Sequence, residues 1–473
     1  MSRLNESVAR VCGLLTRADL SSDQTVKDLL AESASRRHLD LTDLSAAEQA
    51  ELIASRTLQV LPDVNALQKA FTEASDAGRA FVAKFGIDPT APDVHIGHAV
   101  PMMILSRFQR MGHHVVFIVG DITAKIGDPS DRSAARPALT DQEIASNLAT
   151  YRDQVSPFFD FDKAEFRYNG EWLGDITLPQ LIEILAKIPA SMSLQREDFR
   201  NRLAQGHGLS IAELLYSVVM ALDSVEIGCD LEVGGVDQLL NMQMCRKVME
   251  ICGQKPELVA TTLLIEGTDG TGAKMSKSAG NYVALNSPAT EIYGKLMSIP
   301  DRIVVQYLKA LTEWSDTEID VIERRQQQGS IHPMDLKKLL AGEIAAAIHG
   351  VDAAMDARAE FTAQFSRHDF SGVQSMPKVG REMLNETLGA LLTKVLRFLP
   401  SMSEARRIAR QNGLRLVIER DGQQDQIALD ESAVYRTMAE LLEGLPSGIN
   451  EKSAVVYIKS GRKVARIEGI GMS

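Results

Sequence analysis

The chain has 473 residues, of which 45% are hydrophobic and 24% charged. A chain of this length divides into two or three domains, and the composition is ordinary for a globular protein. No run of about 18 apolar residues is present, which excludes an apolar membrane-spanning helix, and the start lacks the apolar core of a secretion signal.

Charge and cysteine content narrow the class of protein further. The formal net charge is −12, but residues 401–473 carry eleven Lys and Arg against ten Asp and Glu, a balance of +1. The first 400 residues therefore carry −13, so a polyanion can bind only at local basic patches. No two cysteines form a Cys-x-x-Cys pair, which argues against a zinc ribbon and fits reduced thiols in a cytoplasm. The cysteines are Cys12, Cys229, Cys245 and Cys252.

Residues 1–50 predict a helical N-terminal extension. Ser45–Ile53 is rich in helix formers, and Ser45 with Glu48 three residues later has the spacing of a capping box. Nothing in the segment indicates chemistry. An arm that stabilises a dimer and an extension without a role of its own are both consistent with it.

A strand, a loop and a helix are predicted between residues 81 and 108. Phe81–Phe85 is mostly apolar, as in a short buried strand, Pro89 and Pro92 mark a loop, and apolar residues recur at helical spacing from Met102. The loop therefore leads into a helix N-terminus, where free backbone N–H groups and the helix dipole favour a phosphate.

Two histidines lie near this predicted helix N-terminus. His95 and His98 flank Gly97, whose missing side chain would let a ligand lie flat against the backbone. On its own, a His-x-x-His pair is more typical of a capped helix or a metal pair than of nucleotide chemistry.

A second strand and a turn-rich loop follow. Val115–Gly120 is a continuous apolar run, typical of a buried parallel strand in a doubly wound sheet. Asp128, Arg132 and Arg136 then fall on one loop. They could form surface salt bridges of little energetic value. Alternatively, the carboxylate could pair a substrate ammonium while the arginines reach a pyrophosphate leaving group.

Further downstream, Ile211–Ser224 has helical periodicity. Tyr216 and Asp223 are seven residues apart within it, so both side chains project from one face, two turns apart.

Thr271–Ser278, Thr-Gly-Ala-Lys-Met-Ser-Lys-Ser, is a small basic loop. Lys274 and Lys277 can reach outward from it. A loop with two lysines is, taken alone, most often solvated surface.

Residues 301–370 predict a helical domain, and residues 371–400 a linker with a helix inside it. The three helical patterns are Ile303–Leu311, Ser315–Gln327 and Pro333–Ile348. The linker is indicated by Gly372, Pro377, Gly380 and Pro400. A plain structural bundle would have the same helical pattern.

Residues 401–473 predict a small basic domain. Ser401–Leu416 resembles the helix-turn of an S4-type RNA-binding domain, and Val455–Ile467 predicts a hairpin. Basic residues share one face of the helix and line the hairpin, as suits a phosphate backbone, although such faces are often only solvated. They are Arg406, Arg407, Arg410, Lys459, Arg462, Lys463 and Arg466.

Two distant motifs in this order carry a family resemblance. His-Ile-Gly-His after a strand, followed much later by Lys-Met-Ser-Lys-Ser, resembles the class I aminoacyl-tRNA synthetases. Gly-Ile-Asp-Pro-Thr-Ala before the first motif and Ile-Gly-Asp-Pro-Ser after it are similar to the tyrosyl-tRNA synthetases, as are Asn169, Trp172 and Gly234–Gln238. The resemblance extends from about Leu52 to the C-terminus.

The resemblance implies the architecture. We expect an α/β protein with a Rossmann-like, doubly wound parallel-sheet catalytic domain at 51–300 that includes a dimerisation insertion. A helical domain at 301–370 would contact the anticodon stem, the linker at 371–400 would follow, and 401–473 would form a small α+β, S4-like RNA-binding domain. The family also implies a homodimer in the cytoplasm, with no membrane association.

The resemblance also implies the reaction. L-tyrosine and ATP would give tyrosyl-adenylate and pyrophosphate, and the tyrosyl group would pass to the 3′-terminal ribose of tRNA(Tyr). Positioning and charge stabilisation do most of this work. Mg2+ would be carried on ATP, without a metal site in the protein.

Site residues follow from the resemblance position by position. Catalytic roles fall on His95, His98, Thr90, Lys274, Lys277, Arg132 and Arg136. Tyrosine would be bound by Asp128, Tyr216, Asp223, Asn169 and Gln238. ATP would be bound by Gly86, Asp88, His95, Gly97, His98, Gly235, Asp237 and Lys277. tRNA would be bound by Arg406, Arg407, Arg410, Lys459, Arg462 and Lys463.

Within this set, Tyr216 and Asp128 would hold the α-amino group and Asp223 the phenol hydroxyl. One substrate of about the length of tyrosine could touch both ends of the Tyr216–Asp223 face. A carboxylate in an apolar pocket must be paired, so Asp223 rewards a ligand hydroxyl and penalises its absence.

The sequence departs from the family pattern at five positions. Met220 stands where a glutamine usually contacts the substrate amino group, and a thioether cannot replace an amide. Leu222 replaces a common tyrosine, Val236 a Ser or Thr, Phe85 a smaller residue near the ribose, and Asp131 a glycine.

These departures leave two alternatives to a tyrosine–tRNA ligase. One is a paralogue that adenylates a tyrosine-like compound for a biosynthetic pathway, although an RNA-binding tail argues against it. The other is a non-catalytic RNA-binding relative, which would have no need of His95, His98 and Lys277.

Overall fold

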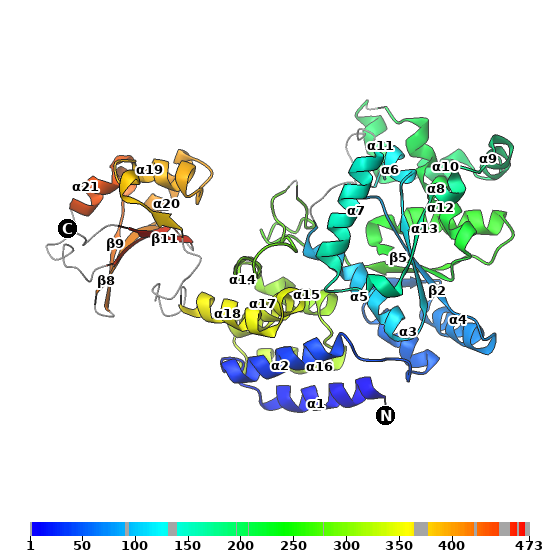
Figure 1. The fold of residues 1–473 in the computed structure, drawn as a ribbon, viewed down its shortest axis with the longest axis horizontal. Coiled ribbons are helices and arrows are strands. Elements are labelled where there is room, and N and C mark those ends of the chain that lie inside the picture. The colour runs from blue at the N-terminus through cyan, green and yellow to red at the C-terminus, as the bar shows by residue number, and fades with distance from the viewer. Residues whose placement is uncertain are drawn as a thin grey trace. The chain divides into compact units, whose positions relative to one another are not determined.

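The computed structural model describes residues 2–89, 94–130, 140–194, 196–206, 208–277, 279–363, 377–420, 423–443, 455–460 and 463–468. The chain forms two compact units, Met1–Ala359 and Glu360–Ser473 (Figure 1). The first unit contains the catalytic fold together with most of the predicted helical domain, so 51–300 and 301–359 are not separate bodies.

The first unit is built on a six-stranded sheet. The strand order is β1-β6-β5-β2-β3-β4, with β1 antiparallel to β6 and all other neighbours parallel. The strands are β1 Gln59–Leu61, β2 Val82–Ile87, β3 His114–Val119, β4 Glu165–Tyr168, β5 Leu231–Gly235 and β6 Leu258–Thr262. The order runs outward from β2 in one direction and from β5 in the other, which confirms the doubly wound fold and places a switch point between β2 and β5.

Helices cover the sheet (Figure 1). They are α4 Val64–Asp76, α5 Ile96–Arg110, α6 Thr123–Ile126, α7 Asp141–Val155, α8 Gly170–Leu173, α9 Leu178–Leu185, α10 Ala190–Leu194, α11 Glu197–Ala204, α12 Ile211–Ile227 and α13 Leu239–Ile251. Phe71, Phe81 and Phe108 stack around His113 where α4 and α5 meet the sheet. No helix in the described part of the chain is long and apolar enough to cross a membrane.

The N-terminal helices are built into the helical part of this unit. They are α1 Arg3–Arg17, α2 Asp23–Arg36 and α3 Ala46–Ala54, and the later helices are α14 Ala289–Leu296, α15 Val304–Leu311, α16 Asp316–Gln327, α17 Pro333–His349 and α18 Val351–Thr362. Helix α1 lies against α16, and α2 against α17 (Figure 1). Buried Arg36 donates to both carboxyl oxygens of Glu318, at 2.7 and 2.6 Å. The expected capping box of Ser45 and Glu48 begins α3.

The second unit is a five-stranded sheet of order β7-β11-β10-β8-β9 with helices packed on it. Its strands are β7 Lys378–Val379, β8 Leu414–Arg420, β9 Gln423–Ala428, β10 Val455–Ser460 and β11 Lys463–Ile467, and its α-helices are α19 Leu388–Ala390, α20 Met402–Arg410 and α21 Met438–Glu443. Val379, Leu388 and Leu391 are buried with Leu416 and Ile458 in its core. Residues 377–400 are therefore part of this domain and do not form the expected linker, because their apolar side chains complete its core.

Candidate active site

A cavity of about 650 Å3 opens at the carboxyl ends of β2 and β5, at the switch point of the sheet. It is lined by most of the residues that the sequence singles out: Gly86, Asp88, His95, Gly97, His98, Asp128, Tyr216, Asp223, Gly235, Asp237, Gln238, Lys274 and Lys277. Thr90, Arg132 and Arg136 lie outside the described residues.

Backbone contacts bring the two distant motifs together. His95 forms an antiparallel bridge with Ala284. On either side of it, Ile96 N–H donates to the carbonyl of Val283 and Leu285 N–H to that of Val94, both at 3.0 Å. The segment that follows the lysine loop is thus hydrogen-bonded to the N-terminus of α5. Lys274 and Lys277 line the same cavity as the two histidines.

His95 caps α5 with its own ring. Gly97 N–H donates to His95 Nδ1 at 3.2 Å, so His95 carries its proton on Nε2 and can donate it to a ligand. A Cβ at Gly97 would lie 2.9 Å from two atoms of this ring. A glycine at position 97 thus leaves room for the His95 ring in its capping position. The sequence suggested a different reason, namely a backbone surface open to a ligand.

Both imidazoles are neutral at pH 7. Burial lowers the pKa of His95 to about 2, helped by His98 and Lys277, and burial lowers the pKa of His98 to about 4. Neutral rings placed beside two lysines can donate hydrogen bonds to phosphate oxygens without adding charge of their own.

Two carboxylates lie in the middle of the cavity. Asp88 accepts from the Tyr216 hydroxyl at 2.9 Å and from Thr123 Oγ1 at 2.7 Å. Asp128 accepts from Gln238 Nε2 at 2.7 Å and from Ser130 Oγ at 2.7 Å. Burial, together with Asp88, raises the pKa of Tyr216 well above its ordinary value, so its hydroxyl stays protonated. A substrate ammonium would find two oriented acceptors here.

Asp223 lies at the buried end of the cavity. It accepts from Trp172 Nε1 at 3.0 Å and from Asn169 Nδ2 at 3.4 Å. Burial raises its pKa to about 7, against the opposing effect of nearby Lys84. Asn169 is fully buried, and the structure places it behind Asp223, where it also donates to Thr123 Oγ1 at 3.1 Å. It orients the carboxylate from behind, whereas the sequence suggested a direct tyrosine contact.

The structure adds supporting residues that sequence reasoning missed. Buried Arg196 donates to Asn241 Oδ1 at 2.7 Å and to Ser130 Oγ at 2.8 Å, and Asn241 donates to Gln238 Oε1 at 2.8 Å. These bonds hold the Asp128 and Gln238 side chains in place. No sequence signal links Arg196 to Ser130 and Asn241, which are distant in the chain. Thr123, in contrast, lies in the segment just after strand β3 and could have been identified from the sequence.

The five departures from the family pattern differ in where they lie relative to the cavity. Met220 and Phe85 line the cavity. Leu222 does not line the cavity; it is buried with Val218 and Ala221 in a hydrophobic cluster against which Met220 packs. Val236 begins a short 3-10 turn, Val236–Gln238, and Asp131 lies outside the described residues. Among the departures that the structure describes, Met220 and Phe85 are the ones that line the cavity.

The predicted RNA-binding residues of the second unit differ in their exposure and in their side-chain partners. On α20, Arg407 and Arg410 are exposed and pair with Glu404 at 2.6 Å and Glu431 at 3.2 Å. Lys463 is exposed as well, and its Nζ donates to the Phe398 carbonyl at 2.8 Å. The exposed cations therefore lie on both α20 and β11. Of the others, Arg406 is half-buried on the same helix, Lys459 is half-buried on β10, and Arg462 lies outside the described residues.

Comparison with known proteins identifies the family. A family model described as "tRNA synthetases class I (W and Y)" matches residues 76–366. A tyrosine–tRNA ligase of Thermotoga maritima is 41% identical over 337 residues, covering 71% of this chain and 83% of the relative. The chain belongs to the tyrosyl-tRNA synthetases. A Geobacter sulfurreducens tyrosine–tRNA ligase is 37% identical over 374 residues, covering 79% of this chain and 92% of that protein. The family inferred from the two motifs is thereby confirmed.

Solved tyrosyl-tRNA synthetases have the same fold. A C-terminally truncated mitochondrial enzyme of Aspergillus nidulans superposes with a TM-score of 0.54 at 24% identity, covering 72% of this chain and 99% of that one. The Archaeoglobus fulgidus enzyme, solved in complex with L-tyrosine, gives 0.52 at 19% identity, covering 66% and 99%.

Proposed function

We propose that this synthetase activates L-tyrosine with ATP and transfers it to the 3′-terminal ribose of tRNA(Tyr), and that the residues around the switch-point cavity carry out the first step. As a member of the tyrosine–tRNA ligase family the protein is an ATP-dependent ligase. The observation that carries the assignment of the site is that Asp223 and the histidine–lysine group line one continuous cavity.

Tyrosine lies along the α12 face in this proposal. Asp223 accepts the phenol hydroxyl, and the ammonium is held by Asp88, Asp128 and the oxygen of Tyr216. Tyr216 already donates its proton to Asp88, which leaves its lone pairs facing the cavity. Both termini of the substrate are thus met by acceptors, as a hydroxyl and an ammonium require.

ATP lies between Gly86 and Gly235, with its phosphates towards α5. An oxygen of the tyrosine carboxylate attacks the α-phosphorus, the bond to the bridging oxygen breaks, and pyrophosphate leaves. His95 and His98 donate to phosphate oxygens as neutral rings, while Lys274 and Lys277 balance the charge that develops on them. Thr90, Arg132 and Arg136 remain proposed partners on the strength of the motif.

Mg2+ is proposed to arrive on ATP. The lysines and imidazoles at the phosphate end complement phosphate oxygens, whereas a hard cation prefers carboxylate and water oxygens. The carboxylate beside them, Asp237, already pairs with Lys274 at 3.5 Å. A magnesium ion bound to the nucleotide would neutralise part of the phosphate charge.

The remaining proposals concern partners and location. Arg406, Arg407, Arg410, Lys459, Arg462 and Lys463 are proposed to contact the tRNA backbone. Charging of tRNA for translation would take place in the cytoplasm.

We also propose a homodimer formed through the insertion that carries α9 and α10. Leu178 and Ile182 are 68% and 54% exposed, and Leu194 on α10 is exposed as well. Such a cluster of exposed apolar side chains is typical of an interaction site. Sedimentation velocity should give a dimer for the wild type and a monomer for the Leu178→Glu/Ile182→Glu variant. A dimer that survives this change contradicts the assignment of the interface.

A second candidate is adenylation of a tyrosine-like compound that lacks the usual amino group. Met220 on the cavity wall favours it, because a thioether offers no hydrogen-bond donor and only a weak acceptor.

Amino-acid-dependent ATP–pyrophosphate exchange separates the two candidates. The panel is L-tyrosine, L-phenylalanine and 3-(4-hydroxyphenyl)propionate, each followed by a tRNA charging assay. Exchange and charging with tyrosine support the ligase, whereas exchange with the deaminated analogue alone supports the second candidate. Exchange with none of them contradicts both.

A further inference from the structure

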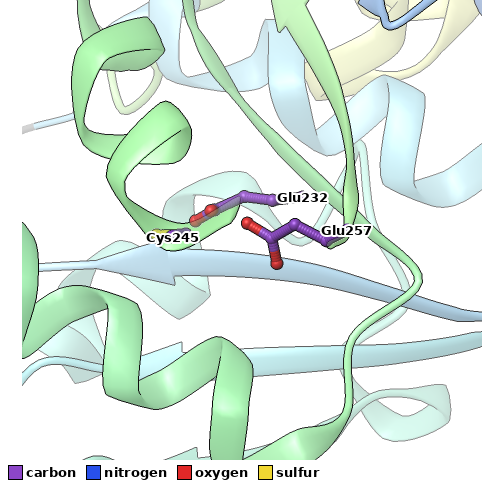
Figure 2. A group of neighbouring side chains, drawn as sticks. All are labelled: Glu232, Cys245 and Glu257. Carbon is purple, nitrogen blue, oxygen red and sulfur yellow. The ribbon is translucent and has the colours of Figure 1, made fainter. Parts of the chain in front are cut away.

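A cluster of charged side chains is buried beneath the tyrosine end of the cavity. Lys84 on β2, Glu232 on β5 and Glu257 just before β6 are 1%, 2% and 1% exposed. Figure 2 shows the carboxyl groups of Glu232 and Glu257 turned towards one another, with Cys245 of α13 beside them. One ligand atom each from Glu232, Cys245 and Glu257 lies within 4.8 Å of the other two.

Lys84 joins this cluster to helix α12. Its Nζ lies 2.9 Å from Glu232 Oε1 and donates to Ser224 Oγ at 2.5 Å. Ser224 follows Asp223 directly in the sequence, and Glu232 lines the same cavity as Asp223. The ammonium already provides the positive charge that a cation would bring to Glu232, so the cluster is complete without a metal ion.

One proton in the cluster balances its charge. Glu232 Oε2 and both carboxyl oxygens of Glu257 are buried without a hydrogen-bond partner among the described residues. A proton on Glu257 that is shared with Glu232 gives a partner to two of these three oxygens, Glu232 Oε2 and one oxygen of Glu257. Burial, followed by the charge of Glu232, raises the pKa of Glu257 well above its ordinary value, in agreement with this arrangement. The sum of ammonium, carboxylate and neutral acid is then zero, as deep burial favours.

Lys84 and Glu232 are the charges of this cluster that act on the pKa of Asp223. Asp88, a further carboxylate of the cavity, is linked to Asp223 through Thr123 and Asn169. Trp172, Asn169 and Tyr216 around Asp223 are neutral. Burial also raises the pKa values of the Cys229 and Cys245 thiols, so neither adds charge beside the carboxyl pair. Of the two charges, Lys84 lowers the pKa of Asp223, against the larger effect of burial, and Glu232 raises it.

We propose that Lys84 is a specificity-determining positioning residue, which acts through Asp223. Its ammonium, balanced by Glu232 and neutral Glu257, favours the ionised form of Asp223, which accepts the substrate's phenol hydroxyl. This inference rests on the proposed contact between Asp223 and the hydroxyl. An ionised carboxylate favours tyrosine and disfavours phenylalanine, whereas a protonated one discriminates less between them.

Lys84→Met tests the inference by leaving Glu232 unbalanced. We measure kcat/KM for tyrosine and for phenylalanine in ATP–pyrophosphate exchange between pH 5.5 and 8.5. At pH 7 the tyrosine-to-phenylalanine ratio should fall by about tenfold or more, and the acid limb of the tyrosine profile should move up by about one pH unit. KM for ATP should stay within about twofold of wild type.

The double variant Lys84→Met/Glu232→Gln separates charge from packing. It removes both charges together, so the ratio and the acid limb should return towards wild-type values. A purely structural role of Lys84 predicts that the double variant is as impaired as the single one. Glu257→Gln should keep the acid limb at its wild-type position, because its amide replaces a carboxyl that is already neutral.

A buried ion pair remote from the cavity provides the matched control. Arg36→Met breaks the pair with Glu318 and should lower the melting temperature without changing the ratio. If Lys84→Met does not fold, Lys84→Gln keeps a donor for Ser224 and should shift both readouts in the same direction. If neither single variant folds, a double variant that falls well below the wild-type ratio overturns the inference.

The outcomes distinguish the inference from the function on which it rests. A wild-type enzyme that does not prefer tyrosine contradicts the proposed role of Asp223. A wild-type enzyme that prefers tyrosine, together with a folded Lys84→Met variant of unchanged ratio and acid limb, contradicts only the role of Lys84.

Discussion

The two ends of the cavity are built in different ways. The phosphate end combines two short motifs, His95–His98 and Lys274–Lys277, whose functional groups lie within four residues of one another in each. The hydroxyl end places Asp223 over side chains from β2, β5 and the segment before β6. The first end has neutral rings and cationic side chains at the cavity wall, and the second has a buried acid whose charge depends on its neighbours.

This difference predicts different responses to pH and mutation. The histidines at the phosphate end stay neutral across the physiological range, because burial lowers their pKa values to about 2 and about 4. Asp223 changes its charge near neutrality. Loss of a phosphate-end residue should therefore slow activation of any amino acid, whereas changes at the hydroxyl end should alter which amino acid is chosen.

Lys277→Ala should have the largest effect. Removing one cation from the developing phosphate charge should lower kcat of tyrosine activation by roughly 100- to 1,000-fold, with little change in KM for tyrosine. Pre-steady-state formation of tyrosyl-adenylate measures it. Lys255→Ala, at a surface lysine that pairs with Glu73, is the control and should retain wild-type rates. An equal loss in both variants would contradict the role of Lys277.

The pH profile should differ between the two ends. Asp223 has a raised pKa of about 7, so it is ionised above that pH and protonated below it. The value of kcat/KM for tyrosine should therefore fall as pH drops through 7, approaching tenfold per pH unit below it, and Asp223→Asn should abolish this limb. The histidines add no limb between pH 5 and 8, because the pKa values of His95 and His98 are lowered to about 2 and about 4. A limb that persists in Asp223→Asn would assign the titration to another group.

Gly97→Ala should have an intermediate effect. The added methyl group would meet the His95 ring at 2.9 Å and displace it from its capping position. We expect kcat of activation to fall by about tenfold for tyrosine and phenylalanine alike, because the phosphate end serves both. Gly13→Ala on α1 is the matched control for the added methyl group, since no atom lies within 4 Å of a Cβ there and the residue does not line the cavity. A fall in kcat for tyrosine but not for phenylalanine would contradict the proposal that the phosphate end serves both amino acids.

Arg407→Glu/Arg410→Glu should have the smallest effect on activation. Losing two phosphate contacts should raise KM for tRNA several-fold, by about 5- to 20-fold, and weaken its dependence on salt. ATP–pyrophosphate exchange should be unchanged. Aminoacylation at several salt concentrations measures it. Arg381→Glu/Lys394→Glu, at two exposed residues elsewhere in the same unit, is the control with the same change in net charge. Equal KM values for wild type and variant would remove α20 from the tRNA-binding surface.

Sequence reasoning reached the phosphate end more completely than the hydroxyl end. His95, His98, Lys274 and Lys277 lie in contiguous motifs, and the structure places all four at one cavity. Asn169 was predicted as a site residue, but its position behind Asp223 was not predicted. Which of the two side chains faces the cavity depends on how α12 packs against the sheet. Leu222 drew attention as a family departure, although its side chain is buried and does not line the cavity.

Domain boundaries illustrate the same limit. Glycine and proline between 371 and 400 suggested a linker, yet Leu388 and Leu391 complete the core of the C-terminal domain. The sequence predicted a helical N-terminal extension without indicating what it packs against, and in the structure Arg36 and Glu318 join it to the helical part of the first unit. Apolar residues predict burial, but not the partner against which they are buried.

The family, the doubly wound fold and the residues of the adenylation motifs could be inferred from the amino-acid sequence, because these depend on local spacing and on contiguous residue types. The buried cluster of Lys84, Glu232 and Glu257, next to the cavity that Asp223 lines, could be found only in the folded chain. Each lies in or beside an apolar strand that has no local signal for a charge cluster, and the charge of each depends on burial and on partners far away along the chain.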